Sequence, residues 1–283
     1  MNKFKDCVAV VTGAGSGIGR QLSYQLGDLN AKLAISDINA DNLEQTRAEL
    51  EKRGVEVFSQ VLDVADERAV FEYAEQCSKV YGSVNLVINN AGVALGAGPL
   101  WETPIEEFKW VMGINFYGVL SGTKAFLPIL QKAQWGHIVN ISSIFGIISV
   151  PEQNAYNASK FAVRGMTEAL RQELKIAQST ISCTSVHPGG IKTNIARNAR
   201  VVERDGIDVQ EVKSQASVDF DKLARTTPES AAQQIIRAVE KDKARLLIGL
   251  DAKFMDLVQR LMPVSYPKLL KFLFGNVGQP NKK

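Results

Sequence analysis

Residues 8–19 read VAVVTGAGSGIG, an apolar run that passes directly into a glycine-rich stretch. A buried strand that turns sharply into a helix produces this pattern. Glycine permits the tight turn and lets backbone N–H groups approach a pyrophosphate, and the helix N-terminus adds a positive dipole end. The stretch therefore predicts a nucleotide site whose contacts include Gly13, Ser16, Gly17, Ile18 and Gly19.

Short apolar runs and amphipathic segments alternate along the rest of the chain. The runs are rich in Val and Ile and lie at 8–11, 32–36, 55–62, 86–89, 137–141, 181–186 and 245–248. Amphipathic periodicity predicts helices over 39–53, 66–81, 104–131, 154–176 and 228–242, and a further helix opens near Gly17. This alternation predicts an α/β fold with a doubly wound, seven-stranded parallel sheet, Rossmann-like and covered on both faces.

No linker or residue-level repeat divides the chain, so we expect a single domain for binding and catalysis over residues 1–250. The segment 197–227 is rich in charge and lacks sustained apolar periodicity, which favours a substrate lid or loop. At its end, Thr227-Pro228-Glu229 has the sequence of a helix start. Residues 251–283 are predicted to form an amphipathic C-terminal extension.

Composition limits the classes of partner. The chain has 283 residues, 45% hydrophobic and 22% charged, as in soluble globular proteins. Its net charge of +3 is too small to indicate nucleic acid as a main partner. Cys7, Cys77 and Cys183 form no C-x-x-C pattern, so we expect buried reduced thiols and no metal site. The N-terminus does not resemble a signal peptide, and a cytoplasmic location is expected, with a peripheral membrane contact left open.

Polar and small residues follow the predicted strands at the rim where such sheets bind ligands. Asp37 comes directly after the second run, at the end of the predicted strand, and a carboxylate there accepts hydrogen bonds from the adenosine ribose and repels the 2′-phosphate of NADP. We therefore expect NAD as the cofactor, with NADP less favoured. The adenine edge is expected near Asp63 and Val64, and small residues let the backbone pass close to the cofactor at Asn90, Ala91 and Gly92.

A second group of residues has the chemistry of proton transfer. Tyr156 and Lys160 are four residues apart and share one helix face. A phenol has a pKa of about 10, and a nearby ammonium favours the phenolate and lowers that pKa. Tyr156 can then give or take the substrate proton as hydride moves. Ser143 follows the fifth run at the rim of the sheet, where its hydroxyl can bind the reacting oxygen.

Together these residues resemble the short-chain dehydrogenase/reductase family of NAD(P)-dependent oxidoreductases. The matching pieces occur in the family's order and spacing, and they are TGAGSGIG (12–19), DV (63–64), NNAG (89–92), Asn115, Ser143, YNASK (156–160) and PGGIKT (188–193). The resemblance implies that Tyr156 is the acid/base, that Lys160 binds the ribose and tunes the Tyr156 pKa, and that Ser143 binds the substrate oxygen.

The resemblance has further implications. Asn115 would hold a water that joins Lys160 to solvent, and the nicotinamide end would contact Pro188, Gly189, Ile191 and Thr193. Family members commonly form oligomers, so a homo-dimer or homo-tetramer is expected. The spacing to Tyr156 favours Ser143 over Ser142. We interpret His137 and His187 as structural, because the chain has no G-x-S-x-G motif of a Ser–His hydrolase.

We expect an NAD-dependent oxidoreductase that interconverts a carbonyl and an alcohol of a lipophilic small molecule. The lipophilic substrate is inferred from apolar residues near the predicted site, Val93, Ala94, Leu95, Phe145 and Ile147, and from the apolar tail. Two alternatives are a non-catalytic NAD-sensing scaffold and a peripheral lipid-binding protein on the same fold. The intact Ser143, Tyr156 and Lys160 argue against the scaffold.

The tail carries an apolar stripe at helical spacing, made of Phe254, Leu257, Val258, Leu261 and Met262. Pro263 should end this helix, and a second amphipathic piece is predicted over 266–274. Such faces require a partner, because burial of each large apolar side chain contributes about 1.5–3 kcal/mol. We expect a protein interface first, either the domain itself or a second subunit, and a membrane contact through 251–274 second.

Overall fold

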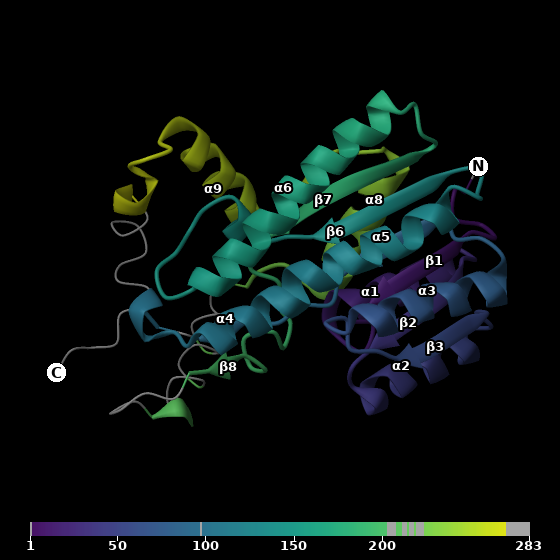
Figure 1. Ribbon diagram of the computed structural model, residues 1–283, viewed down its shortest axis with the longest axis horizontal. Helices are drawn as coiled ribbons and strands as arrows, with labels where there is room; N and C mark the ends of the chain where they lie inside the picture. The colour runs from purple at the N-terminus through teal and green to yellow at the C-terminus, as the bar shows by residue number, and fades with distance from the viewer. Residues whose placement is uncertain are drawn as a thin grey trace.

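The computed structural model describes residues 2–96, 98–202, 208–210, 214, 218 and 224–269. Its main sheet has seven parallel strands in the order β3-β2-β1-β4-β6-β7-β9 (Figure 1). These strands are β1 (Val8–Thr12), β2 (Lys32–Asp37), β3 (Val57–Val61), β4 (Leu86–Asn89), β6 (Gly136–Ile141), β7 (Ile181–Pro188) and β9 (Arg245–Ile248). The predicted Rossmann-like sheet is confirmed.

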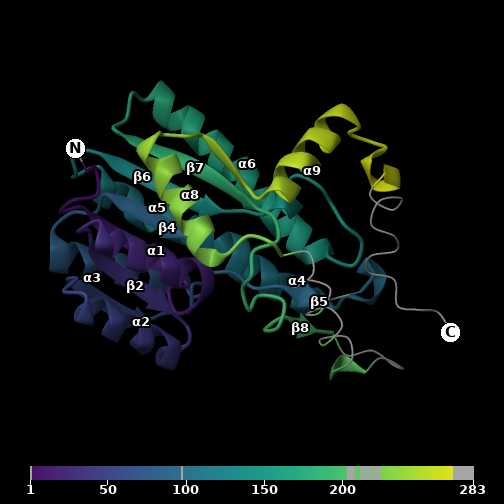
Figure 2. The ribbon, with the colours of Figure 1, turned by 180° about the vertical axis from the view of Figure 1, so that it is seen from behind.

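Helices cover both faces of the sheet, and the two views separate them (Figures 1 and 2). The core under one face contains side chains of α1, α2 and α8, and the core under the other contains side chains of α3, α5 and α6. Their bounds are α1 (Gly17–Asp28), α2 (Ala40–Lys52), α3 (Glu67–Tyr81), α5 (Gly118–Leu130), α6 (Asn154–Ile176) and α8 (Pro228–Glu240). The three cysteines are buried and unbonded, as the sequence predicts.

The chain order reverses direction across the sheet between β1 and β4, which are neighbours in space. From β1 the strands run to β2 and β3 on one side, and from β4 to β6, β7 and β9 on the other. Ligands of doubly wound sheets bind outside the carboxyl ends of the strands at this switch point. The glycine turn that follows β1 therefore opens at the expected place.

Two predicted elements have different bounds in the structure. The third run was expected to be extended from Val55, but the backbone N–H of Val55 bonds to Leu50 at the end of α2, so β3 begins only at Val57. The segment 104–131 is interrupted. It divides into α4 (Ile105–Met112), a π-helical stretch (Gly113–Tyr117) and α5, and Asn115 lies in that stretch. Such π-bulges are frequent at functional sites.

The two ends of the predicted lid segment 197–227 are attached to the domain. Its first part forms β8 (Arg200–Val201), which pairs in parallel with β5 (Leu95–Gly96), the short strand after β4. Its last part forms an isolated bridge between Thr226 and Ile191. Most residues between these anchors, at 203–207, 211–213, 215–217 and 219–223, lie outside the described residues, so the prediction of a lid is not tested there.

The helix α9 (Leu250–Leu261) buries a different face from the one that the sequence predicts. Of the five residues in the predicted stripe, only Val258 is buried, and the other four are exposed. The buried positions besides Val258 are Ala252 and Asp256. Ala252 is small enough to approach Ile144 on the loop after β6, and both belong to one apolar cluster. Ala252 therefore lies on the face of α9 that packs on the domain, together with Asp256 and Val258.

Pro263 lies just beyond the end of α9, as predicted, and residues 266–269 begin a further helical turn. The rest of the predicted second amphipathic piece, residues 270–274, lies outside the described residues, as does 275–283. In the part of the chain that the structure describes, no helix has both the length and the apolar character needed to cross a bilayer.

Candidate active site

The glycine turn after β1 forms a cradle for an anionic group. Gly13 and Gly17 adopt positive φ values of 66° and 52°, which side chains other than glycine rarely tolerate. A Cβ at Gly13 would lie 2.9 Å from the Cα of Ala91, so this turn runs directly against the turn after β4. The N-cap residue of α1, Ser16, is exposed and its side chain forms no capping hydrogen bond. Open helix N–H groups behind a glycine turn fit a pyrophosphate.

The turns after β1 and β4 are held together by their own hydrogen bonds. Thr12 Oγ1 accepts hydrogen bonds from the backbone N–H groups of Asn90 (3.0 Å) and Ala91 (3.1 Å). In return, Asn90 Nδ2 donates to the carbonyl oxygen of Thr12 at 2.9 Å. The structure therefore brings the predicted residues 13–19 and 90–92 into one surface, where the backbone faces the site.

Asp37 lies at the end of β2, beside the glycine turn. Its carboxylate accepts hydrogen bonds from the backbone N–H groups of Gly15 (2.8 Å) and Asn39 (2.9 Å). The nearby Arg20 does not neutralise it, because its guanidinium donates to the carbonyl oxygens of Gly15 and Asn42 and to Thr46 Oγ1. Asp37 thus keeps an unpaired negative charge at the predicted ribose position.

Asp63 and Val64 follow β3 at the same rim. The Asp63 carboxylate is exposed and accepts a hydrogen bond from the backbone N–H of Ala65 at 2.9 Å. Val64 packs against the start of α5, where a Cβ at Gly118 would lie 2.9 Å from its side chain. Both residues therefore lie at the rim of the sheet, and their contact with adenine stays a prediction.

Tyr156 and Lys160 lie in the first turns of α6 and face the end of β6. Lys160 Nζ lies 5.5 Å from the centre of the Tyr156 ring and donates to the carbonyl oxygen of Ile141 at 3.0 Å. The Lys160 side chain is buried, and a Cβ at Gly92 would lie 3.5 Å from its Nζ. The two predicted catalytic side chains are thus brought together next to the turn after β4.

The two serines at the end of β6 have different partners. Ser142 Oγ donates to the backbone carbonyl of Lys160 at 2.8 Å and is buried inside the domain. Ser143 Oγ accepts from the backbone N–H of Phe145 at 3.1 Å, and its hydroxyl hydrogen bonds with Tyr156. Only Ser143 is therefore placed to reach a substrate oxygen together with Tyr156.

Burial shifts the pKa values of both candidate catalytic groups. It raises the pKa of Tyr156 above the usual 10.0, and the hydrogen bond from Ser143 opposes this rise. It lowers the pKa of Lys160 from 10.5 to about 8. The sequence predicts that Lys160 lowers the Tyr156 pKa, but in this structure burial of the phenol has the larger effect. The phenol therefore holds its proton at neutral pH, in the form that can protonate a carbonyl oxygen.

Asn115 is fully buried and pins the loop after β4. Its Oδ1 accepts from the backbone N–H of Val93 (2.8 Å), and its Nδ2 donates to the Val93 carbonyl oxygen (2.9 Å) and to Ser159 Oγ (3.3 Å). A Cβ at Gly92 would lie 3.1 Å from Asn115 Oδ1. The residue lies among the predicted site residues, and these contacts explain why the helix bulges at this point.

The turn after β7 holds the residues predicted for the nicotinamide end. The backbone N–H of Gly189 donates to Ile248 at 2.9 Å, and Ile191 is buried where it bridges to Thr226. Thr193 faces the glycine turn, because a Cβ at Gly17 would lie 3.1 Å from its Cγ2. Pro188 is the last residue of β7. All four predicted residues therefore lie at the end of β7 or in the turn that follows it.

Sequence reasoning missed Asp251, which fixes this turn from the first turn of α9. Its Oδ2 accepts a hydrogen bond from the backbone N–H of Gly190 at 2.7 Å. A Cβ at Gly189 would collide with the same carboxylate. Asp251 lies outside the part of the chain that carries the family motifs, so only an acidic residue in the first turn of a predicted helix could have marked it.

We expect Asp251→Ala to weaken NADH binding about tenfold, because a hydrogen bond to a charged group contributes about 1.5–3 kcal/mol. The matched control is Asp41→Ala, which removes a carboxylate from the first turn of α2 at an exposed position. Fluorescence titration of NADH against both variants measures the effect. Equal affinity in the two variants would show that Asp251 does not position the turn.

The two histidines have structural partners, as predicted. His137 Nε2 lies 2.8 Å from Thr184 Oγ1, and His187 Nδ1 lies 3.0 Å from the backbone carbonyl of Ser143. Burial lowers the pKa of each imidazole from 6.5 to about 4. Both rings are therefore neutral at pH 7, and neutral His187 can donate to Ser143 and hold the end of β6.

These shifts predict acid sensitivity. Below about pH 6.5 the unfolded chain binds protons at both rings and the folded chain does not, so stability falls toward about pH 4. Each ring contributes at most about 1.4 kcal/mol per pH unit. The melting temperature should fall steeply between about pH 7 and about pH 5. This fall should be shallower in His187→Asn, which keeps a donor for the backbone carbonyl of Ser143. Identical slopes would contradict this explanation.

A buried polar network behind the site was also missed. Asn89 Nδ2 donates to Asn140 Oδ1 at 2.8 Å and to Thr123 Oγ1 at 3.2 Å. Asn140 Nδ2 donates in turn to Thr167 Oγ1 at 3.0 Å. The network joins β4, β6, α5 and α6 beneath the catalytic residues. The only sequence signal is that each Asn lies at or next to the end of an apolar strand run.

Comparison with known proteins agrees with this geometry. Residues 7–203 match the family model described as short chain dehydrogenase. The chain is a member of the short-chain dehydrogenase/reductase family. It is 47% identical over 271 residues to a putative oxidoreductase, SadH, of Mycobacterium tuberculosis, and the alignment covers 95% of this chain and 96% of that protein.

Two solved structures of the short-chain dehydrogenase/reductase fold are similar to this chain. One, from Burkholderia phymatum in complex with NAD, has a TM-score of 0.84 and 30% identity, covering 95% of this chain and 97% of that one. An alcohol dehydrogenase from Thermococcus sibiricus, complexed with 5-hydroxy-NADP, has a TM-score of 0.71 and 26% identity over 86% and 96%. The protein is thus an NAD(P)-dependent oxidoreductase of this family.

Proposed function

We propose that the protein uses NAD(H) to interconvert a carbonyl and an alcohol on a lipophilic small molecule, with Tyr156 as the acid and base. The observation that supports this most strongly is the convergence of Ser143, Tyr156 and Lys160 beside the glycine turn. A non-catalytic scaffold would have no need of a buried lysine beside a phenol whose hydroxyl bonds with a serine.

In the direction of carbonyl reduction, bound NADH supplies a hydride to the carbonyl carbon. Tyr156 donates its phenolic proton to the carbonyl oxygen as negative charge develops there. The Ser143 oxygen accepts from the backbone N–H of Phe145, and its hydroxyl hydrogen, which bonds with Tyr156 in this structure, would turn to the same substrate oxygen when substrate binds. Alcohol oxidation runs these proton transfers in reverse.

Lys160 lowers the cost of forming the phenolate. Its ammonium lies 5.5 Å from the Tyr156 ring, where a positive charge stabilises the anion left after proton transfer. We assign the ribose hydroxyls to the same ammonium. We assign Asn115 to hold a water beside Lys160, and residues 188–193 to hold the nicotinamide end.

The preference for NAD follows from Asp37. Its carboxylate is fixed by two backbone N–H groups, and no described basic side chain forms an ion pair with it. A 2′-phosphate at the ribose would meet this charge at close range. The next residue, Ile38, is exposed and offers no positive charge.

The lipophilic substrate is supported by the side chains around Tyr156. Phe145 packs edge-on against the Tyr156 ring with centres 6.0 Å apart, and Val93 and Ala94 are partly exposed. Leu95 and Ile147, which the sequence places near the substrate, are buried in apolar clusters behind this surface. They therefore support the wall of the site and do not line it. Segment 197–227 is proposed as the lid over this wall.

A panel of ketones and alcohols with increasing alkyl length tests the proposal, with the absorbance of reduced nicotinamide as the readout. We expect kcat/KM to rise with length by up to about fourfold per methylene, the value of burying one such group. No turnover of any compound would favour the NAD-sensing scaffold. Turnover that does not depend on alkyl length would contradict the lipophilic substrate.

Assembly and location are part of the same proposal. We expect a homo-dimer or homo-tetramer in the cytoplasm. Light scattering of the purified chain measures the mass, and a monomer at working concentration would contradict the expected assembly.

A further inference from the structure

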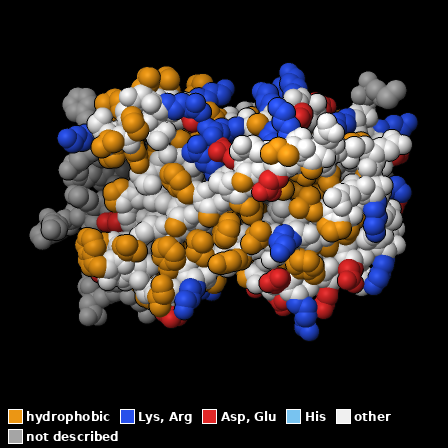
Figure 3. Space-filling view, turned by 45° about the horizontal axis from the view of Figure 1, so that its top comes forward, with side chains coloured by type: hydrophobic (Ala, Val, Ile, Leu, Met, Phe, Trp, Pro, Cys, Tyr) orange, Lys and Arg blue, Asp and Glu red, His pale blue; other side chains and the backbone are white. Residues whose placement is uncertain are grey.

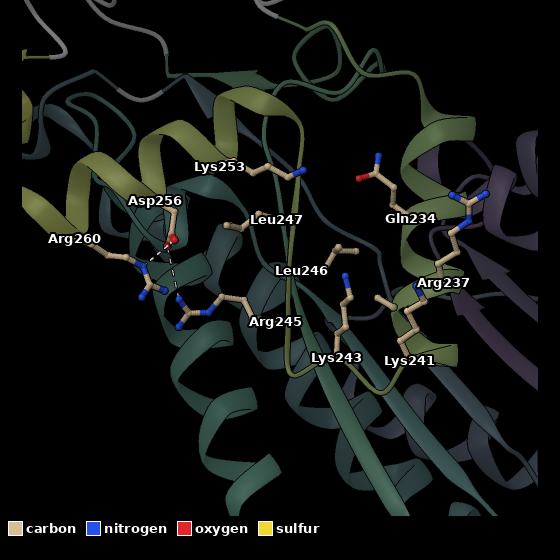
Figure 4. Close-up of a pocket in the computed structure, with 11 residues that line it drawn as sticks. Gln234, Arg237, Lys241, Lys243, Arg245, Leu246, Leu247, Lys253, Asp256 and Arg260 are labelled. Carbon is tan, nitrogen blue, oxygen red and sulfur yellow. Dashed lines mark hydrogen bonds and ion pairs between the residues drawn. The ribbon is translucent and has the colours of Figure 1, made fainter.

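The edge of the sheet at β9 carries a basic groove. It is a hollow of about 450 Å³ between α8, β9 and α9, outside the candidate active site. Figure 4 shows Lys253 extending toward it from α9 and Lys243 from just before β9, with Arg260 beside Asp256 on one side and Arg237 and Lys241 on the α8 side. Its charged lining residues are Arg237, Lys241, Lys243, Arg245, Lys253, Arg260 and Asp256.

Most of this positive charge is not neutralised. Asp256 accepts a hydrogen bond from Arg260 at 2.8 Å and lies 3.7 Å from Arg245, so one carboxylate is shared by two arginines. Over the described ranges, no ion pair is formed by the other four cationic residues of the groove, and all four are exposed. They are Arg237, Lys241, Lys243 and Lys253.

Two acidic side chains beside the groove are already bound. Asp242 pairs with Arg171 at 3.0 Å and accepts a hydrogen bond from Ser182, and Glu168 pairs with Arg164 and Arg245. These two carboxylates therefore do not neutralise the lysines of the groove.

An apolar ridge runs along α9 beside the groove. Leu250, Phe254, Leu257 and Leu261 recur at helical spacing, and their exposed fractions are 83%, 44%, 54% and 73%. In the space-filling view, hydrophobic side chains gather at the end of the molecule that carries α9, and Lys and Arg side chains lie next to them (Figure 3). The ridge and the groove share one helix, whose remaining face is packed on the domain.

We propose that this face docks on a membrane surface that carries anionic lipid headgroups. An amphipathic helix of this kind lies in the interface with its apolar side chains among the acyl chains and its basic side chains against the headgroups. The ridge supplies the apolar side chains, and the groove supplies the basic ones. The sequence that follows, 270–283, contains three lysines and no acidic residue, so it adds charge of the same sign.

The charge of the groove argues against a second copy of this chain as the occupant. A two-fold interface places the same patch on both subunits face to face. The positively charged groove of one subunit would then face the same positively charged groove of the other, and the repulsion between them disfavours the contact. Anionic headgroups are complementary to it.

This proposal stands independently of the proposed function. The two are connected in space, because α9 packs through Ala252 against Ile144, close to Ser143. Docking through α9 would therefore place the candidate active site near a reservoir of lipophilic compounds. A failure of membrane binding would leave the hydride chemistry untouched.

Flotation of the full chain with vesicles tests the proposal. We compare vesicles of phosphatidylcholine alone with vesicles in which about a third of the lipid is phosphatidylglycerol. We expect the protein to float only with the second, and to be released at salt on the order of 0.5 M. The triple change Lys241→Glu, Lys243→Glu and Lys253→Glu should weaken partitioning at least about a hundredfold, since each basic residue contributes about fivefold.

Controls make the same chemical changes elsewhere. The control for the groove is the triple change Lys52→Glu, Lys79→Glu and Lys132→Glu, which alters the net charge by the same amount at exposed positions outside the groove. Its partitioning onto anionic vesicles should stay within about twofold of the wild-type value. For the ridge, we expect Leu257→Gln with Leu261→Gln to weaken partitioning about tenfold or more.

The matched control for the ridge is Val80→Gln with Ile176→Gln, which alters exposed apolar residues of α3 and α6. NADH binding should be unchanged in every variant, which shows that each one is folded.

Failure of the wild type to float with anionic vesicles overturns the proposal. So does flotation that the groove substitutions do not reduce. A ridge variant with lower mass in light scattering, together with a wild type that does not float, would identify a second copy as the occupant.

Discussion

Replacement of Tyr156 by Phe is expected to lower kcat by about a hundredfold or more, the scale of lost general acid–base catalysis. Phe keeps the ring that packs against Phe145 and beside Lys160, but removes the hydroxyl that bonds with Ser143. The substrate oxygen then has no proton donor. NADH affinity should remain within about threefold of the wild-type value, because the glycine turn and Asp37 are unchanged.

The control for this substitution is Tyr24→Phe, which removes a phenolic hydroxyl on α1, where Tyr24 stacks with Arg53 and lies outside the site. Its kcat should equal that of the wild type. Steady-state rates and NADH titration on both variants measure the effects separately. Near-normal kcat in Tyr156→Phe would show that another group transfers the proton.

The second large effect concerns cofactor choice. We expect the wild type to favour NAD over NADP in kcat/KM by at least about tenfold, because a close contact between like charges costs on the order of a few kcal/mol. In Asp37→Ala this preference should shrink, since the charge that opposes a 2′-phosphate is gone. Loss of the acceptor for Gly15 N–H should also raise the KM for NAD.

Asp37→Asn separates charge from shape. Asn keeps an oxygen that can accept a hydrogen bond from the Gly15 N–H, but it removes the charge. The preference for NAD over NADP should therefore shrink because kcat/KM with NADP rises. The KM for NAD should change less than it does in Asp37→Ala. Kinetics with both cofactors measure this. A wild type that prefers NADP would overturn the assignment, and Arg20 would then be the first residue to re-examine.

The fold and the grouping of the candidate catalytic residues could be predicted from sequence because their signals are local. The predicted helix 154–176 coincides with α6, and all seven predicted runs are strands of the main sheet. Tyr156 and Lys160 share a face because four residues make about one helical turn. Ser143 and the residues at 90–92 meet them because carboxyl ends of parallel strands share an edge.

Contacts between distant segments could not be predicted in this way. The bulge at Asn115 depends on two hydrogen bonds to Val93, which lies on another element. The position of α9 depends on which small residue fits against the loop after β6, and Ala252 is weaker in a periodicity argument than the leucines on the opposite side. An apolar stripe shows that a helix is amphipathic, but it does not show what lies against the stripe.

The helix α9 contributes both to the candidate nicotinamide end and to the exposed ridge, two features that the sequence analysis treats separately. Asp251 in its first turn binds the turn of residues 188–190, and its later turns form the exposed ridge. A partner that binds the ridge therefore acts on a helix that also fixes the candidate nicotinamide end. Comparing NADH affinity with and without anionic vesicles would show whether the two are coupled.

Transfer of deuterium from NADH labelled at C4 of the nicotinamide tests the central claim most directly. A lipophilic ketone from the substrate panel is reduced by the wild-type protein, and the alcohol is analysed by mass spectrometry and NMR. NADH carries two hydrogens at C4, one on each face of the ring, and either can be replaced by deuterium. We predict that the deuterium appears on the carbinol carbon for one of these two labels. We also predict that Tyr156→Phe makes the same product at least about a hundredfold more slowly. An alcohol without deuterium from either label, or no reduction of any ketone, would contradict the account.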